Sequence, residues 1–441
     1  MLLGTQHINP AGHLEIGGCD TTHLASEFGT PLYVMDEAVI RQNCRAYREA
    51  FETRYPRNII CYAGKAFLSL AMCKIVQDEG LYLDVASAGE LYTALKADFA
   101  PERINMHGNN KSRTELKMAV ENGIAHVVVD NFLEIETLSQ ITTEMAKDID
   151  VLVRCSPGVD PHTHKFISTG QADTKFGFNI KDGSAMQAVR AVLSAPGLNL
   201  DGIHCHVGSQ LLDIEAHEGA VDIMVSLMKE ISDETGTIIN VLNIGGGLGV
   251  RYRSEHRPPA FCCFAESITS RLKAALDKAG LAWPILQQEP GRCIVGEAGT
   301  TLYTVGAIKT VPITADPGHR TYVAVDGGMS DNPRPQLYDA VYELIVANKA
   351  NQPHDQIVSI AGKHCETDVL IYDVASANMV PGDILAVQTT GAYNHAMASN
   401  YNKILRPAVV LVNEGTAEII VERETLDNIM LRERLPERFS K

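Results

Sequence analysis

Residues 58–67 read NIICYAGKAF, an apolar and β-branched run that ends in small residues around a single lysine. Such a run is typical of a buried strand with a polar group at its end. The same unit, a short apolar run, a polar or glycine-rich break and a longer stretch of helical periodicity, recurs eight times between residues 58 and 292. The eight runs are NIICYAGKA, LYLDVASAGE, RINMHGNN, HVVVDN, VLVRCSPG, LDGIHCHVGSQ, VLNIGGGLG and ILQQEPGR.

The alternation of strands with helices indicates parallel strand pairing, and eight such units over this length predict a closed (β/α)₈ barrel of the TIM type. An open, doubly wound sheet is the alternative. In a barrel the active site lies at the carboxyl ends of the strands. The polar residues and glycines at or just beyond these ends are Lys65, Asp84, His107, Asp130, Arg154, His206, Gly245 to Gly247 and Glu289.

The sequence changes character after the eighth run, and a chain of 441 residues is longer than one core usually organises. Residues 289–441 hold β-rich segments separated by Gly, Pro and Asn turns, which predicts an all-β domain, a β-sandwich or β-barrel. Two short strands near the start, HLEIGG and TPLYVMD, are expected to join it. The predicted division is N-terminal strands over 1–36, the barrel over 37–288 and the β domain over 289–441.

Composition limits the partners and the compartment. The chain has 54 acidic residues against 38 Lys and Arg, a formal charge of −16, so we expect neither nucleic acid nor a membrane as partner. The first residues lack the basic and long apolar regions of a secretory signal, and no apolar run is long enough to span a bilayer. Ten cysteines without regular spacing are typical of reduced thiols. We therefore predict a cytoplasmic protein.

Lys65 is the candidate nucleophile. Its small neighbours predict a shielded position, where burial lowers the pKa of the amine and favours a Schiff base with a carbonyl substrate or with pyridoxal phosphate. An aldolase needs only the lysine, whereas pyridoxal phosphate also needs a phosphate site and a carboxylate facing its ring nitrogen. The glycines of NIGGGLG, expected just ahead of a helix, can bind phosphate, and Glu289 can face the ring. Taken singly, these features also fit a surface lysine, a tight turn and a rim ion pair.

His204 and His206 fall on one face of a predicted strand, because side chains repeat every two residues. A His-x-His pair is a zinc signature in some barrel hydrolases. Those enzymes carry the pair on the first strand, where this chain has Lys65. We therefore expect no metal, a hydrogen-bonded core position for His204, and a position for His206 from which it can stack on a flat ring.

Further motifs extend over nearly the whole chain. They are GTPLYVMDE, YAGKAF, DVASAGEL, STGQADTKFGF, HCHVGSQ, NIGGGLG, EPGR, DGGMSDNPRPQLYDA, GKHCETD and GAYNHAMASNYN. In this order they resemble the alanine-racemase-like, fold-type III pyridoxal-phosphate decarboxylases. The resemblance implies an N-terminal barrel, a C-terminal β domain, pyridoxal 5'-phosphate as cofactor and a homodimer with composite active sites.

The resemblance also implies roles for single residues. Lys65 would carry the cofactor, His206 would stack on its ring and Glu289 would face its ring nitrogen. The other cofactor-binding residues would be Asp84, Ser209, Gly246, Gly247, Gly291, Arg292 and Tyr393. The substrate-binding residues would be Arg292, Arg334, Tyr338, Glu366 and Tyr393. Cys365 would be the proton donor, and it would reach in from the partner subunit together with Glu366.

The expected reaction is decarboxylation of meso-2,6-diaminopimelate to L-lysine and CO₂, the last step of lysine biosynthesis. Arg334 and Tyr338 in NPRPQLYDA can bind a distal carboxylate, whereas an enzyme for ornithine or lysine would need an acid there. The alternatives are decarboxylation of another carboxylate-bearing amino acid, including one tethered to a carrier protein, a metal-dependent barrel hydrolase, and a catalytically silent pyridoxal-phosphate-binding homologue.

Overall fold

The computed structural model describes residues 2–159, 174–313 and 318–439. The chain divides into two compact units. The barrel unit comprises residues 41–251 and 255–295. The sheet unit comprises residues 1–40, 252–254 and 296–441. The limits of the folding domains, predicted from sequence to follow residues 36 and 288, stay a prediction.

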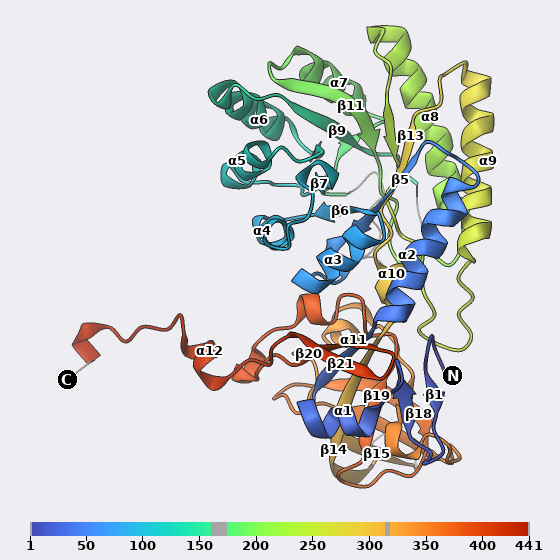
Figure 1. The fold of residues 1–441 in the computed structure, drawn as a ribbon, viewed down its shortest axis with the longest axis vertical. Coiled ribbons are helices and arrows are strands. Elements are labelled where there is room, and N and C mark those ends of the chain that lie inside the picture. Colours follow the sequence, from blue (N-terminus) through green and yellow to red (C-terminus); the bar gives the residue numbers. More distant parts are fainter. Residues whose placement is uncertain (1, 160–173, 314–317, 440–441) are drawn as a thin grey trace. The chain divides into compact units, whose positions relative to one another are not determined.

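In the described part of the chain, eight parallel strands close into a barrel, as the sequence predicted (Figure 1). They follow one another around the barrel in chain order, and β8 pairs with β9 to complete the ring. The strands are β5 (Asn58–Ala63), β6 (Tyr82–Val85), β7 (Ile104–Met106), β8 (His126–Val129), β9 (Ile149–Ser156), β11 (Leu198–His204), β12 (Val241–Asn243) and β13 (Ile285–Gln288). The short β10 (Phe178–Asn179) pairs with β9.

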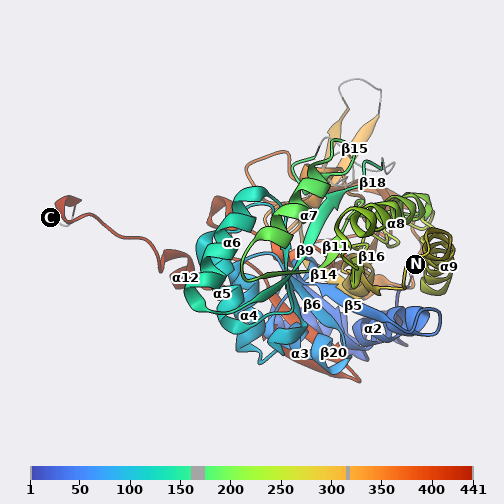
Figure 2. The same ribbon diagram turned by 90° about the horizontal axis from the view of Figure 1, so that it is seen from above.

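Helices surround the strands on the outside of the barrel (Figure 2). They are α2 (Glu37–Glu52), α3 (Leu70–Asp78), α4 (Ala88–Lys96), α5 (Arg113–Asn122), α6 (Phe132–Met145), α7 (Ser184–Ser194), α8 (Glu215–Thr235) and α9 (Phe261–Ala279), and the short α10 (Arg292–Val295) follows β13. Helices α3 to α6 each begin after a Ser or Asn whose side chain accepts a backbone N–H of the first turn. These caps fix where each helix starts, and therefore how long the loop at each strand end is.

The barrel strands are buried on both faces, which is why they read as continuous apolar runs. All four residues of β8 are buried, and Val128, Leu152 and Val241 from three strands form an apolar cluster. Strands β11 and β12 approach closely at Gly202, where a Cβ atom would lie 2.1 Å from the carbonyl oxygen of Val241. Glycine is therefore needed at this position.

The described residues of the sheet unit form one nine-stranded and one three-stranded sheet. In the larger sheet, β4 (Leu32–Asp36) pairs with both β14 (Gly299–Pro312) and β20 (Ala408–Asn413), so an N-terminal strand joins the C-terminal ones as predicted. Its other strands are β15 (His319–Val325), β16 (Leu344–Val346), β17 (Gln356–Ala361), β18 (Val369–Ser376), β19 (Ile384–Val387) and β21 (Thr416–Val421). The smaller sheet contains β1 (His7–Ile8), β2 (Leu14–Ile16) and β3 (Cys19–Asp20).

The described helices of the sheet unit are α1 (Thr21–Phe28), α11 (Arg334–Tyr338) and α12 (Leu426–Met430). Its core joins both ends of the chain, because Leu32, Leu302 and Val410 are fully buried in one apolar cluster. All ten cysteines of the protein are free thiols, of which seven are buried and three, Cys262, Cys263 and Cys365, are exposed. Within the described ranges, no helix is at once long and apolar enough to cross a membrane.

Candidate active site

Side chains from the carboxyl ends of the barrel strands line one cavity of about 280 Å³. A closed parallel barrel gathers these ends at one mouth, so residues far apart in sequence meet there. Of the predicted site residues, Lys65, Asp84, His206 and Glu289 line the cavity. Its other lining residues are Ala63, Gly64, Val85, Ala86, Glu90, His107, Gly108, Asn109, Arg154, Lys175, Phe176 and His204.

Lys65 occupies a 3₁₀ turn, Gly64–Ala66, directly after β5. Its side chain is exposed, whereas Gly64 and Ala66 are buried, so the expectation of a buried lysine was wrong. The turn explains the difference, because it carries the lysine beyond the strand end. The backbone beside it is tightly packed: a Cβ atom on Gly64 would lie 2.8 Å from the carbonyl oxygen of Asp84.

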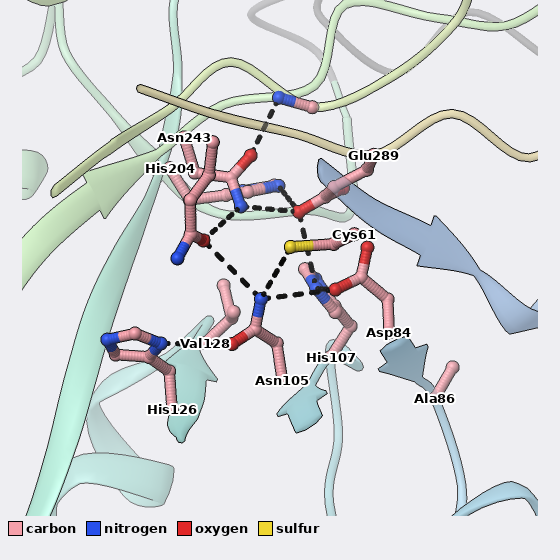
Figure 3. Close-up of polar contacts among 12 residues, drawn as sticks. Cys61, Asp84, Ala86, Asn105, His107, His126, Val128, His204, Asn243 and Glu289 are labelled. Carbon is pink, nitrogen blue, oxygen red and sulfur yellow. Dashed lines mark hydrogen bonds and ion pairs between the residues drawn. The ribbon is translucent and has the colours of Figure 1, made fainter. Parts of the chain in front are cut away.

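Glu289 follows β13 and accepts three contacts on one carboxylate oxygen (Figure 3). Its Oε1 lies 2.8 Å from Nδ2 of Asn243, 3.1 Å from Nε2 of His204 and 3.3 Å from Nε2 of His107. Burial alone would raise the pKa of Glu289, but the neighbouring His107 and His204 outweigh burial and hold this pKa well below its usual value. The carboxylate therefore loses its proton at a lower pH than the two rings lose theirs, and it is ionised once the rings are neutral.

Asp84, at the end of β6, is the second carboxyl group beside these rings. Its Oδ1 lies 3.2 Å from Nδ2 of Asn105 and 3.4 Å from Nε2 of His107. Burial, followed by the charge of Glu289, raises the pKa of Asp84 well above its usual value. Of these two buried carboxyl groups, Glu289 therefore ionises more readily than Asp84.

The histidines of the site are held in their neutral form. Burial lowers the pKa of His107 and of His204 to about 4. His206 lines the cavity, and burial together with the charge of Lys65 holds its pKa well below the usual value. A neutral, flat ring therefore borders the cavity at His206.

The histidine pair considered as a zinc site is not the group that comes together. Within the described ranges, the side chains whose ligand atoms all lie within 4.8 Å of one another are His107, His204 and Glu289. Nε2 of each ring faces Oε1 of Glu289 at the ion-pair distances given above. His204 has the buried core position that was predicted, with Nε2 at 3.1 Å from Glu289, but neither of its ring nitrogens has a hydrogen-bond partner among the described residues.

The glycines after β12 form a crowded turn. A Cβ atom on Gly246 would lie 2.0 Å from the backbone carbonyl oxygen of Glu289, and one on Gly247 would lie 2.4 Å from that of Gly208. Gly247 also has a φ of +125°, which other residues rarely adopt. The helix expected directly after this turn is absent from the described residues that follow, since α9 begins only at Phe261. The turn itself, rather than a helix N-terminus, presents the backbone here.

Ser209 and Arg292 meet beside this turn in the barrel unit. Nη2 and Nε of Arg292 lie 3.0 and 3.3 Å from Oγ of Ser209. The arginine is 4% exposed and begins α10. Gly291 before it packs against β5, because a Cβ atom there would lie 3.0 Å from that of Ala63. A hydroxyl and a buried guanidinium are thus held together next to the glycines.

Arg154 and Asp130 complete the strand-end set of the barrel. Nε of Arg154 lies 3.7 Å from Oδ2 of Asp130, and its guanidinium carbon lies 4.3 Å from the ring centre of Phe176. Asp130 also accepts a hydrogen bond of 3.1 Å from the backbone of Gly177. Phe176 and Gly177 belong to the motif STGQADTKFGF, of which residues 168–173 lie outside the described residues.

The remaining predicted site residues belong to the sheet unit, where three of them gather. The guanidinium carbon of Arg334 lies 4.9 Å from the ring centre of Tyr338 and 5.3 Å from that of Tyr393. Arg334 is 5% exposed, and its buried Nε has no hydrogen-bond partner among the described residues. Two aromatic rings therefore flank a buried cation.

Cys365 and Glu366 lie on an exposed loop of the sheet unit. The backbone N–H of Cys365 donates to Oδ1 of Asn402 at 3.0 Å, and Oη of Tyr401 donates to Glu366 at 2.6 Å. The loop is fastened by Asp368, a buried residue whose carboxylate accepts from the backbone and the ring of His364. The cysteine is thus presented to solvent on a held backbone.

The family described as "Pyridoxal-dependent decarboxylase, pyridoxal binding domain" matches residues 37–296. A diaminopimelate decarboxylase of Bacillus subtilis is 48% identical over 430 residues, which cover 97% of each chain. The chain belongs to the diaminopimelate decarboxylase family.

Other family members agree over the full length. The diaminopimelate decarboxylase of Bacillus methanolicus is 46% identical over 96% of each chain. A crystal structure of the M. jannaschii diaminopimelate decarboxylase in complex with L-lysine has a TM-score of 0.91 and 35% identity, and covers 99% of this chain and 100% of that one. The similarity to members of this family therefore extends over both units of the chain.

Sequence reasoning missed several residues that support the site. Asn243 and Asn105 are fully buried polar residues inside barrel strands, and His217 on α8 faces the carbonyl oxygen of Gly246 at 3.1 Å. Lys111 and Glu134 form a buried ion pair of 2.6 Å, and Lys111 also donates to the carbonyl oxygen of Gly108 at the cavity. Both asparagines lie within sequence runs given above. An amide side chain inside an otherwise apolar strand was the signal that could have identified them.

Proposed function

We propose that this protein uses pyridoxal phosphate to decarboxylate meso-2,6-diaminopimelate to L-lysine and CO₂, the last step of lysine biosynthesis. The observation that carries the proposal is that Lys65 lines the same cavity as the ionised Glu289. An amine that can bind the aldehyde and a carboxylate that can face the ring nitrogen are what this cofactor requires of a site. The family membership supports the choice of substrate.

The residues around the cavity fit the cofactor. The glycine turn leaves no room for a Cβ atom at Gly246, so a phosphate can approach the backbone closely. Ser209 and the buried Arg292 add a hydroxyl and a guanidinium beside it. In the proposal, the residues that bind the cofactor are Lys65, Asp84, His206, Ser209, Gly246, Gly247, Glu289, Gly291, Arg292 and Tyr393.

The chain's own groups divide the work of the reaction. When bound, pyridoxal phosphate supplies an electron sink for the charge left on the α-carbon as CO₂ departs. Glu289, which accepts a hydrogen bond from Asn243 and lies beside His107 and His204, would hold a proton on the ring nitrogen. Asp84 ionises less readily than Glu289, so Glu289 is the carboxyl group that carries the charge first.

Residues of the sheet unit bind the substrate in this proposal. Arg334 is buried, flanked by Tyr338 and Tyr393, and can hold a distal carboxylate through a bidentate pair. Tyr393 and Glu366 of the sheet unit and Arg292 of the barrel unit are the further substrate contacts. Cys365 returns a proton to the α-carbon as a general acid.

We further propose that the protein is a homodimer in which Cys365 and Glu366 of one subunit complete the cavity of the other. The position of Cys365 on an exposed loop supports this assignment, since an exposed thiol is available to a partner. We assign the reaction to the cytoplasm, because ten free thiols persist in a reducing compartment.

The test starts from purified protein. It should show the absorbance band of lysine-bound pyridoxal phosphate and release equimolar CO₂ and L-lysine from meso-diaminopimelate. Lys65→Ala should abolish both turnover and the trapping of the cofactor by borohydride. Lys175→Ala is the matched control, because Lys175 also lines the cavity. Borohydride should still trap the cofactor in this variant. Trapping that survives in Lys65→Ala, or a wild-type protein without the band, would overturn the proposal.

A further inference from the structure

A chain of buried polar side chains runs through the barrel interior toward Glu289 (Figure 3). Asn105, Asn243 and Gln287 lie on β7, β12 and β13, and each is fully buried. Buried amides are costly unless they are hydrogen-bonded, so their contacts describe what they do. These three residues are bonded to one another and to the residues of the cavity.

Asn243 uses both ends of its carboxamide. Its Nδ2 donates to Oε1 of Glu289 at 2.8 Å and to Oε1 of Gln287 at 3.1 Å. Its Oδ1 accepts from the backbone N–H of Gly245 at 2.8 Å. One side chain thus bonds both to the carboxylate assigned to the ring nitrogen and to the first residue of the glycine turn assigned to the phosphate.

Asn243 is itself connected, through Gln287, to residues nearer the amino ends of the strands. Oε1 of Gln287 also lies 3.4 Å from Nδ2 of Asn105, whose Oδ1 faces Nδ1 of His126 at 2.9 Å. Nε2 of His126 lies 2.9 Å from Oδ2 of Asp201. His126 is the first residue of β8, so this series of contacts starts near the amino ends of the strands and ends at the carboxyl-end cavity.

We propose that Asn243 is a positioning residue that sets the spacing between the ring-nitrogen carboxylate and the phosphate turn. The proposal rests on the proposed cofactor function. Glu289 and Gly245 belong to different loops, and the backbone bond from N–H of Glu289 to the carbonyl oxygen of Gly245, 3.0 Å long, also joins them. That bond fixes the main chains, whereas Asn243 fixes the carboxylate oxygen relative to the turn.

The chemistry of the two ends predicts separable effects. Without the Nδ2 donor, Glu289 loses a charge-assisted hydrogen bond and its rotamer is less restricted. Without the Oδ1 acceptor, the N–H of Gly245 is left without this partner and the turn loses an anchor. Asn243→Ala removes both ends. Asn243→Asp has nearly the same shape and keeps an acceptor for Gly245, but it replaces the amide donor with a second carboxyl group that competes with Glu289 for one negative charge.

The experiment measures dissociation constants of three probes for cofactor-free protein. The probes are pyridoxal phosphate, its analogue with carbon in place of the ring nitrogen, and pyridoxal without phosphate. Asn243→Ala should lower the preference for pyridoxal phosphate over each of the other two by about tenfold, the effect of one hydrogen bond to a charged group. Asn243→Asp should lower only the preference over the carbon analogue.

The control is Asn199→Ala, which removes an exposed asparagine of β11 bonded to Asp150 and should leave both preferences unchanged. A uniform loss of affinity for all three probes in both variants, or wild-type preferences in both, would mean that Asn243 serves folding alone and would overturn the proposal. The near-isosteric Asn243→Asp keeps the test decisive if Asn243→Ala does not fold. A wild-type protein with no preference for the ring nitrogen would instead contradict the role of Glu289 in the proposed function.

Discussion

Arg334 decides between substrates in the proposed function, because it is the buried cation between two aromatic rings. Arg334→Ala should leave cofactor binding intact. It should lower kcat/KM for meso-diaminopimelate by a factor that corresponds to about 2–5 kcal/mol of lost transition-state stabilisation, the effect of breaking a desolvated charge pair. L-lysine and L-ornithine should be poor substrates of the parent, since their distal ammonium would meet a cation. The variant should discriminate less, because a repulsive contact is removed as well.

Steady-state kinetics with the three amino acids measure this preference. The exposed Arg432→Ala is the matched control and should behave as the parent does. A parent protein that decarboxylates lysine as fast as diaminopimelate, or an Arg334→Ala variant with full discrimination, would remove Arg334 from the substrate site.

For single residues, the sequence identified which residue types stand at the strand ends, but it did not predict how exposed their side chains are. Lys65, Asp84 and Glu289 were predicted from their positions at strand ends, and they do line one cavity. The exposure of Lys65 was not predictable, because it depends on a 3₁₀ turn that the small residues permit but do not dictate. Asn243 was overlooked, since its function lies in contacts with Glu289 and Gly245, and a single strand does not reveal such contacts.

Among the elements, α8 carries a buried histidine whose protonation opposes folding. Burial lowers the pKa of His217 to about 4, whereas an unfolded histidine titrates near about 6.5. The unfolded state therefore binds the proton first as pH falls. The free energy of unfolding should drop between about pH 6.5 and 4, and His217 alone should contribute about 3 kcal/mol of that loss.

Urea unfolding of the cofactor-free protein across this range measures the effect. His217→Gln keeps a donor for the carbonyl oxygen of Gly246 and cannot take up the proton, so its unfolding free energy should vary less with pH. The exposed His23→Gln should retain the parental slope. An unchanged slope in His217→Gln would show that this ring does not oppose folding at low pH.

The elements themselves were largely predictable where burial is complete. Each barrel strand was found because strands buried on both faces are continuous apolar runs, as in HVVV of β8. In the sheet unit, β18 is harder to recognise from sequence, because Tyr372 and Asp373 interrupt its apolar residues with exposed ones. The prediction of a helix directly after the glycines was wrong. Gly245 to Gly247 indicate a turn, and a turn of this kind forms whether or not a helix follows it directly.

For the whole molecule, the proposal of composite sites predicts complementation between inactive chains. Lys65→Ala and Cys365→Ala should each be inactive, and a mixture of the two should recover up to about a quarter of wild-type activity, since half of the dimers would hold one intact site. Lys65→Ala mixed with Glu289→Ala is the control. Both changes lie in the barrel unit, so no heterodimer gains an intact site. Absence of recovery after complete exchange would mean that each site is built within one chain.

The exposed cysteines provide a way to follow the exchange of subunits between dimers. Seven cysteines are buried, and Cys365→Ala removes one of the three exposed ones. A maleimide dye would then attach only at Cys262 and Cys263, at the start of α9. Donor- and acceptor-labelled batches of this variant would follow subunit mixing by energy transfer, without an engineered tag and without a change among the barrel residues that line the cavity.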